Sequence, residues 1–167
     1  MDNSSTSQGS SARVASALAA KGVRLEIREF PASTRTAADA AAAIGCDIAQ
    51  IAKSIILRST LSNRVVLVIT SGTNRVDEAK VSQHVGEPLT KADAEFVRNK
   101  TGFSIGGVAP VGHLEPPIVL MDADLLQYES VWAAAGTPNS VFCITPHQMT
   151  VVVDGLAIVD IKQENQA

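Results

Sequence analysis

The residues best suited to chemistry in this sequence are one lysine and a distant glycine-rich segment. The segment runs from Thr101 to His113 and contains four glycines and one proline among apolar residues. Glycine loses much backbone entropy on folding, so this density indicates a tight bend or a close approach of the backbone to another group. Lys53 follows an apolar helical pattern and precedes an apolar strand pattern. Together, these features predict a small pocket lined by backbone N–H groups and one cation.

Each half of this predicted pocket also has a purely structural interpretation. A lysine where a helix gives way to a strand favours the helix C-terminus, an effect of ~0.3–1 kcal/mol. The apolar residues around Lys53 favour instead a lysine that faces a cleft and binds an anion or a developing oxyanion. The pair Gly106-Gly107 either lets N–H groups converge on a carbonyl or phosphate, or makes a bend at a sheet corner. No Walker-type or dinucleotide-binding pattern surrounds the pair.

Other reactive side chains form no pattern of a nucleophile or a metal site. No Gly-x-Ser-x-Gly sequence occurs and no histidine pair has zinc-ligand spacing, so we expect neither a metal nor a cofactor. His113 ends the glycine-rich segment and is a candidate to line the same cleft, whereas His84 and His147 lie in polar contexts. Cys46 and Cys143 match no metal or redox spacing and are expected to be reduced thiols. A hydrolase that uses the thiol of Cys143 as its nucleophile is a weaker hypothesis than those given below.

The composition bounds the class of protein. The chain has 167 residues, of which 46% are hydrophobic but only 4% aromatic, so the core must consist of aliphatic side chains. A net charge of −3 argues against a broad duplex-binding surface and against DNA as a partner. It still allows the protein to bind the end of a nucleic acid. No apolar run is long enough for a membrane span. Residues 1–11 are polar and resemble no targeting signal, so we expect a disordered tail, a domain over 12–167 and a cytoplasmic location.

The order of the predicted elements is mixed, which indicates an α+β fold: a single domain with a curved mixed β-sheet flanked by helices. Periodicity and capping residues predict the elements. The helices are Ala12–Lys21, Thr36–Ile44, a short turn capped by Asp47, Asp77–Val85, Thr90–Lys100 with Asp93 at the cap, and a short helix from Pro146. The strands are Val23–Arg28, Ser54–Leu57, Val65–Thr70, Ile118–Met121, Val131–Ala134, Ser140–Ile144 and Leu156–Ile161.

Three separated motifs resemble the YbaK/prolyl-tRNA-synthetase-associated domain family. They are Ala32–Ala41 with Gln50–Ile56, then Thr101–Phe103 with Gly106–His113, and finally Ala134–Gly136 with Thr145-Pro146. The resemblance extends from Val14 to Asp160 and implies a YbaK-like fold and a single-domain trans-editing enzyme. Such proteins hydrolyse the ester bond of mischarged aminoacyl-tRNA, commonly proline tRNA that carries a smaller or similar amino acid.

The resemblance also implies roles for particular residues. Lys53 corresponds to the family's essential lysine, which positions the terminal adenosine and the ester. Gly106 and Gly107 would offer N–H groups to the carbonyl, and Ala134 and Gly136 would border the amino-acid pocket. An ester is already activated, so positioning and oxyanion stabilisation suffice, and water or a ribose hydroxyl of the tRNA acts as nucleophile.

The amino acid that is removed is left open by the sequence. Cysteine-specific members usually have serine where Ala134 aligns, and alanine-specific members usually have asparagine after the lysine, where this chain has Ser54. The chain looks more like groups that act on other small amino acids, such as aminobutyrate, serine or threonine. The leading hypothesis is thus a deacylase that binds the acceptor end of mischarged tRNA, with prolyl-tRNA synthetase as a candidate partner. The alternative is a non-catalytic tRNA- or synthetase-binding module of the same fold.

Overall fold

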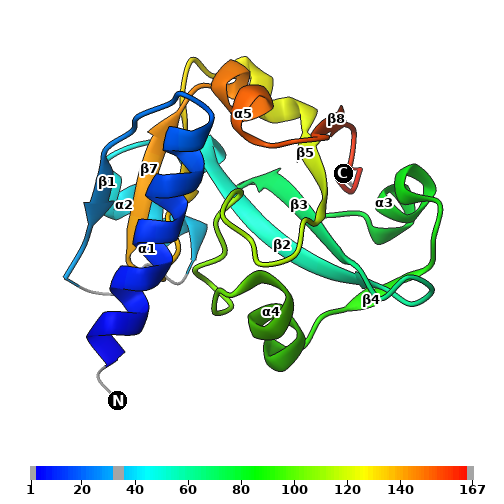
Figure 1. Cartoon of the computed structure of the whole chain (residues 1–167). Helices are drawn as coiled ribbons and strands as arrows, with labels where there is room; N and C mark the ends of the chain where they lie inside the picture. The colour runs from blue at the N-terminus through cyan, green and yellow to red at the C-terminus, as the bar shows by residue number, and fades with distance from the viewer. Residues whose placement is uncertain (1–2, 32–35, 165–167) are drawn as a thin grey trace.

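A mixed β-sheet with helices on both faces forms the architecture of the protein (Figure 1). The computed structural model describes residues 3–31 and 36–164. The first four residues of the motif at Ala32–Ala41 therefore lie outside the described residues. The arrangement confirms the predicted α+β fold with its mixed sheet and flanking helices. No helix in the described ranges is long and apolar enough to cross a membrane.

The sheet contains eight strands in the order β1-β7-β6-β2-β3-β5-β8, with β4 paired to β2 beside this path. The pairs β2–β6, β3–β5 and β5–β8 are parallel, and the others are antiparallel. Both predicted hairpins, β2–β3 and β6–β7, are present. The strand bounds are β1 Ile27–Glu29, β2 Ile51–Ser59, β3 Val65–Ser71, β4 Leu89–Lys91, β5 Ile118–Asp122, β6 Val131–Ala134, β7 Ser140–Ile144 and β8 Ala157–Val159.

Local capping explains where most helices begin and end. The side chains of Thr36, Asp77, Asp93 and Thr145 each accept a hydrogen bond from the first turn of the helix that follows. Left-handed glycines end three of these helices. The helices are α1 Asn3–Ala20, α2 Ala37–Ile44, α3 Glu78–Val85, α4 Ala94–Thr101 and α5 Pro146–Val152, with 3-10 turns at Ile48–Gln50 and Ala123–Gln127.

Three elements differ from their prediction. The helix α1 begins at Asn3, within the segment predicted to be a disordered tail, and Ser10 is buried against the turn at Gly136. Residues 23–28 alternate between half-buried and exposed as predicted, but only the end of this segment pairs as β1. Thr90 lies in the short strand β4, because α4 begins after the cap at Asp93. Strand β4 is too short to show a period in the sequence.

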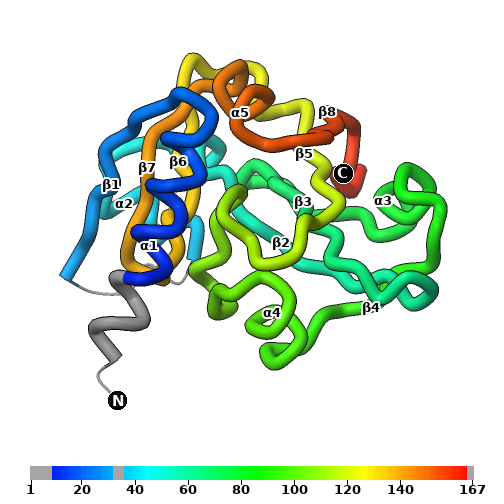
Figure 2. Tube along the Cα trace, in the orientation of Figure 1, coloured from blue at the N-terminus to red at the C-terminus, as the bar shows by residue number. Residues whose placement is uncertain are grey.

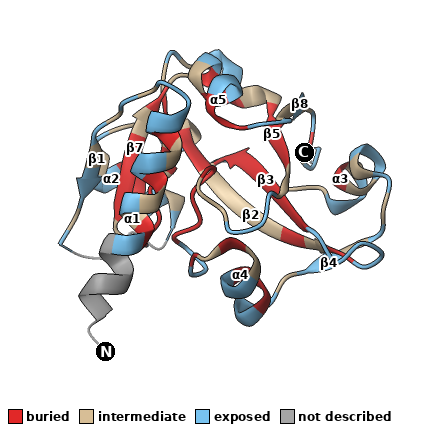
Figure 3. Cartoon of the chain, viewed as in Figure 1, coloured by how far each residue is buried: buried red, intermediate tan, exposed pale blue. Residues whose placement is uncertain are grey.

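The two faces of the sheet carry separate cores. On one face, α1, α4, α5 and the glycine-rich segment pack over the largest hydrophobic cluster, which includes Val14, Phe103 and Met149. On the other face, α3 covers a second cluster through Val81, and α2 covers Ile51 through two alanines. Strand β3 lies between these cores, and all its residues are buried (Figure 3).

The first helix fixes the glycine-rich segment against the sheet. Figure 2 shows this segment running between α4 and β5, and the Arg13 guanidinium of α1 reaches both of its ends. Arg13 Nε donates to the Gly112 carbonyl at 2.7 Å, and its Nη2 donates to the Gly102 carbonyl at 2.9 Å. The guanidinium also lies 4.5 Å from the centre of the Phe103 ring. The N-terminal helix is therefore part of the framework that holds the segment.

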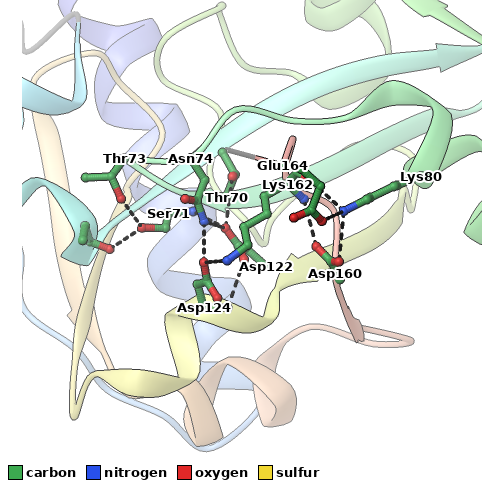
Figure 4. A network of polar contacts seen from close by, with 11 residues as sticks. Thr70, Ser71, Thr73, Asn74, Lys80, Asp122, Asp124, Asp160, Lys162 and Glu164 are labelled. Atoms are coloured by element: carbon green, nitrogen blue, oxygen red, sulfur yellow. Dashed lines mark hydrogen bonds and ion pairs between the residues drawn. The ribbon is translucent and has the colours of Figure 1, made fainter. Parts of the chain in front are cut away.

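A buried carboxylate anchors the end of β3 (Figure 4). Asp122 Oδ2 accepts hydrogen bonds from Thr70 Oγ1 at 3.3 Å, from the Ser71 N–H at 3.1 Å and from Asn74 Nδ2 at 2.8 Å. Its Oδ1 accepts from the Asp124 N–H at 2.9 Å. Thr70 is the cross-strand partner of Lys53, so this network fixes the strand beside the lysine.

Candidate functional site

A cleft runs along β2 and is lined by residues of α2 and α3 and by residues of the glycine-rich segment. It has two chambers, of about 240 and 410 Å³, and Lys53, Ile105 and Gly106 line both of them. The first chamber lies toward α2 and the β6–β7 hairpin, with Ala134 and Thr137 in its wall. The second lies toward β4 and the segment between β3 and α3. Lys53 therefore stands where the two chambers meet.

An interruption in strand pairing creates the edge along which the cleft runs. Strand β6 pairs with β2 only at Ile51 and Ala52, and β4 pairs only from Leu57 onward. The Ile51 carbonyl accepts from the Gly72 N–H and the Ser59 N–H donates to the Arg64 carbonyl, so the odd residues of β2 bond toward β3. The peptide groups of the alternate residues Ser54 and Ile56 consequently point away from β3, toward the unpaired edge. This edge offers backbone donors and acceptors to a ligand.

Lys53 lies inside β2 rather than at a junction between helix and strand. It is the third residue of the strand, half-buried, and Thr70 faces it across the ladder. Its ammonium makes no hydrogen bond or ion pair with any residue that the structure describes. A cation of this kind, held on a strand and lacking a counter-ion, is available to an anionic or oxyanionic group of a ligand.

The adjacent residues Gly106 and Gly107 have different structural roles. Gly106 lines both chambers with a φ of +91°, a left-handed conformation that favours glycine. Its N–H makes no hydrogen bond within the described parts of the chain. The Gly107 N–H instead donates to the Ser104 carbonyl at 3.0 Å and closes a turn. The predicted pair of N–H donors is thus reduced to one, at Gly106.

Gly107 allows a close approach between the glycine-rich segment and the β6–β7 hairpin. A Cβ atom at Gly107 would lie 2.7 Å from the carbonyl carbon of Thr137 and 3.0 Å from the Pro138 nitrogen. Both neighbours are backbone atoms, so neither can rotate away. Gly107 therefore brings together two walls of the first chamber.

We expect the substitution Gly107→Ala to destabilise the protein by ~1–3 kcal/mol, because added volume in a packed site forces the backbone apart. Gly9→Ala is the matched control, since Gly9 lies exposed in α1 and a methyl group there would meet nothing within 4 Å. That control should gain ~0.5–1 kcal/mol from helix propensity. Urea unfolding of both variants measures the two effects, and equal stability of Gly107→Ala and the parent would contradict the packing argument.

The β6–β7 hairpin contributes one of its two predicted residues to the cleft. Ala134 lines the first chamber, as do Thr137 and Ser140. Gly136 lines neither chamber, because it faces α1: a Cβ there would lie 2.9 Å from the Ser10 carbonyl oxygen and 3.3 Å from the Phe103 ring. Its role is to let the hairpin turn beneath α1, so Gly136 supports the pocket wall from behind.

His113 is half-buried against the core residue Phe103 and lines neither chamber. Its Nε2 is 2.6 Å from the Ala109 carbonyl, to which it donates, and its ring meets Phe103 edge-on at 5.3 Å. Burial lowers the pKa of His113 below its ordinary value of 6.5, with a smaller contribution from the nearby Arg13 charge. The position of His113 at the end of the glycine-rich segment predicts a contact with the cleft. The fold does not make this contact.

The half-buried His113 should make stability depend on pH below about 6.5. Because its pKa is lower in the folded protein, the unfolded chain binds the extra proton first, so the contribution of His113 is complete above pH 6.5 and is lost as pH falls. The slope is at most about 1.4 kcal/mol per pH unit for one proton. Urea unfolding at several pH values should show a flatter profile for His113→Gln than for the control His147→Gln, an exposed position. Parallel profiles would contradict this assignment.

The cleft contains no thiol, imidazole or metal cluster among its described lining residues. Cys143 lines neither chamber, and burial together with the charge of Asp47 raises the pKa of the nearby Cys46 thiol. The hydroxyls of Thr137 and Ser140 bond to one another at 2.6 Å. The arrangement suits chemistry in which the protein positions a substrate and stabilises charge, while the nucleophile comes from elsewhere.

Sequence reasoning missed two features of this site. Ser54 lines both chambers, and its buried Oγ has no hydrogen-bond partner within the described residues. The second chamber also carries Arg75 and Lys91, which are about sixteen residues apart in sequence and belong to no motif. Only the position of Ser54 directly after Lys53 could have signalled its exposure to the cleft.

Comparison with known proteins identifies the family of the chain. The family model of the aminoacyl-tRNA editing domain matches residues 31–151. The uncharacterized protein YwhH of Bacillus subtilis (strain 168) is 32% identical over 125 residues, which cover 75% of this chain and 79% of that protein.

Solved structures extend the similarity to nearly the whole chain. One, described as a candidate trans-editing enzyme for prolyl tRNA synthetase, is 44% identical with a TM-score of 0.86, over 93% of this chain and 98% of that one. A scaffold protein from computational epitope grafting is 42% identical with a TM-score of 0.87, over the same shares. The resemblance to the YbaK/prolyl-tRNA-synthetase-associated family is thereby confirmed, and the chain belongs to the aminoacyl-tRNA editing domain family.

Proposed function

We propose that this protein is a trans-editing deacylase that hydrolyses the ester bond of mischarged aminoacyl-tRNA. The substrate we propose is proline tRNA that carries a small non-cognate amino acid, and the setting is the cytoplasm, alongside prolyl-tRNA synthetase. The observation that carries the proposal is Lys53, a cation without a counter-ion in the described residues, at the junction of two chambers in an editing-domain fold.

The first chamber suits the amino-acid part of such a substrate. Its wall is mainly apolar, with Ile51, Val108 and Ala134 among the lining residues, and its volume of about 240 Å³ is the smaller of the two. A small side chain gains from such a wall, whereas one methylene changes binding by only ~1–3 kcal/mol. The chamber therefore favours small amino acids as a class rather than one of them.

The chemistry requires only charge stabilisation and a positioned nucleophile. Attack of water on the ester carbonyl, either directly or after a ribose hydroxyl has taken over the acyl group as a new ester, places negative charge on the carbonyl oxygen. The Lys53 ammonium and the Gly106 N–H are two donors in the cleft that can meet this oxygen. The bond to the ribose oxygen then breaks, that oxygen takes up the proton that the attacking water gives up, and the free amino acid and the free 3′ end of the tRNA are the products. One such donor typically contributes about a hundredfold to a thousandfold in rate.

A panel of mischarged tRNAs tests the proposal. The protein is incubated with proline tRNA charged with alanine, serine, threonine, cysteine or aminobutyrate, and with prolyl-tRNA as the control, and the release of each amino acid is followed. We expect release of at least one small amino acid and none of proline. Binding of charged tRNA without turnover of any of the five would contradict the proposal and favour the alternative, a non-catalytic binding module.

A further inference from the structure

The second chamber of the cleft differs from the first in size and charge. Its volume is about 410 Å³, and its lining includes three cations, Lys53, Arg75 and Lys91, against one carboxylate, Glu78. The chain as a whole carries a net charge of −3. A local excess of positive charge in a net acidic protein indicates a site for an anionic group.

The cations of the second chamber also differ from most other lysines of the protein. Four lysines that lie outside the cleft form ion pairs with carboxylates: Lys21, Lys80, Lys100 and Lys162. Within residues 3–31 and 36–164, the side chains of Arg75 and Lys91 make no hydrogen bond or ion pair. Both are exposed, so a ligand anion would meet charges that no described carboxylate has neutralised.

The backbone holds these two side chains on opposite sides of β2. Arg75 follows β3, and its carbonyl accepts from the Gln163 N–H at 2.8 Å. Its neighbour Asn74 is fixed by hydrogen bonds of 2.8 Å to each of Asp122 and Asp124 (Figure 4). Lys91 lies on β4 and is paired with Leu57 of β2. The two charges therefore flank the chamber from anchored positions.

We propose that the second chamber binds the sugar–phosphate backbone of the unpaired 3′ end of the tRNA, with Arg75 and Lys91 as phosphate ligands. The inference rests on the proposed function, since it follows from the position of the ester at Lys53. With the amino acid in the first chamber, the nucleotides on the other side of the ester must leave through the second. Two cations in the lining of one chamber suit a chain of phosphates, and Lys53, where the two chambers meet, is placed to contact the terminal nucleoside.

Binding of a single-stranded RNA provides the test. The probe is a short RNA that ends in CCA and carries a 5′ fluorophore, and its affinity is measured by anisotropy between 50 and 200 mM salt. The variants are Arg75→Gln, Lys91→Gln and the double variant, and Arg24→Gln is the control: an exposed arginine outside both chambers. We expect the double variant to bind at least tenfold more weakly at the lowest salt. The slope of log K against log salt should become shallower by ~0.7 for each phosphate that the variant no longer neutralises.

Kinetics separate this inference from the proposed function. On aminoacyl-tRNA the double variant should raise KM at least tenfold with kcat retained, whereas aminoacyl-adenosine, which lacks phosphates, should be hydrolysed as by the parent protein. An unchanged Kd and salt slope in the double variant, or no RNA binding by the parent protein, would overturn the inference. If the parent protein binds RNA through these cations but releases no amino acid, only the proposed function fails.

Discussion

Replacement of Lys53 by methionine should lower the kcat for deacylation by about a hundredfold to a thousandfold, the usual effect of removing one oxyanion donor. Methionine keeps much of the length and the apolar stem of the side chain but removes the ammonium. Because Lys53 forms no ion pair with the described residues, the thermal midpoint of the variant should stay close to that of the parent protein. Release of amino acid under single-turnover conditions measures the chemical step.

The control for this experiment is Lys21→Met, a lysine outside the cleft that pairs with Asp154. It should retain the activity of the parent protein, because an exposed ion pair contributes little. If Lys53→Met kept its kcat within about threefold of the parent, Lys53 would have no part in catalysis of the kind that an oxyanion donor provides. A loss confined to KM would instead assign Lys53 to binding of the tRNA end.

The substitution Asp122→Asn should cost about 2–3 kcal/mol of unfolding free energy, because it leaves buried polar groups unsatisfied. Hydrogen-bond donors face both carboxylate oxygens: Thr70, Ser71 and Asn74 at Oδ2, and the Asp124 N–H at Oδ1. An asparagine has one oxygen, so in either orientation its NH₂ group meets a donor. Unfolding by urea, followed by circular dichroism, measures the loss.

Asp160→Asn is the matched control, because Asp160 is largely exposed and pairs with Lys80 at the surface. Its unfolding midpoint should change little. The buried variant should also reduce deacylation, since Thr70 is both a hydrogen-bond partner of Asp122 and the cross-strand partner of Lys53. Equal midpoints for the two variants would show that the network at Asp122 does not anchor the end of β3.

The parts of the fold that the sequence predicts well are those set by local signals. Thr36, Asp93 and Thr145 act as helix caps as predicted, because a capping side chain and its partner N–H lie within three residues of each other. Lys53 and Gly106 are likewise found together at the cleft. Their meeting follows from the family resemblance rather than from any property of the two residues alone.

The parts of the fold and of the site that the sequence does not predict depend on pairing between distant segments of the chain. Strand β6 pairs with β2 in a register that leaves the edge at Ser54 and Ile56 open. The two segments share no sequence pattern that would predict this pairing. His113 is polar and adjacent to glycines, but it lies half-buried against Phe103 and outside the cleft, and the sequence does not encode that placement locally. Gly107 resembles Gly106 in sequence, and only the turn at Ser104 distinguishes their N–H groups.

The parallel contact between β2 and β6 has a consequence for folding. The residues that meet there lie far apart in the chain, as in the hydrogen bond from Gln50 to the Ser130 carbonyl, which spans 80 residues. Closing so long a loop is slow compared with forming a hairpin or a helix. The first chamber needs β6 and β7 as walls, so it exists only after this late step. During synthesis the protein should therefore acquire its ability to bind an aminoacyl group abruptly, once the β6–β7 hairpin has emerged and docked.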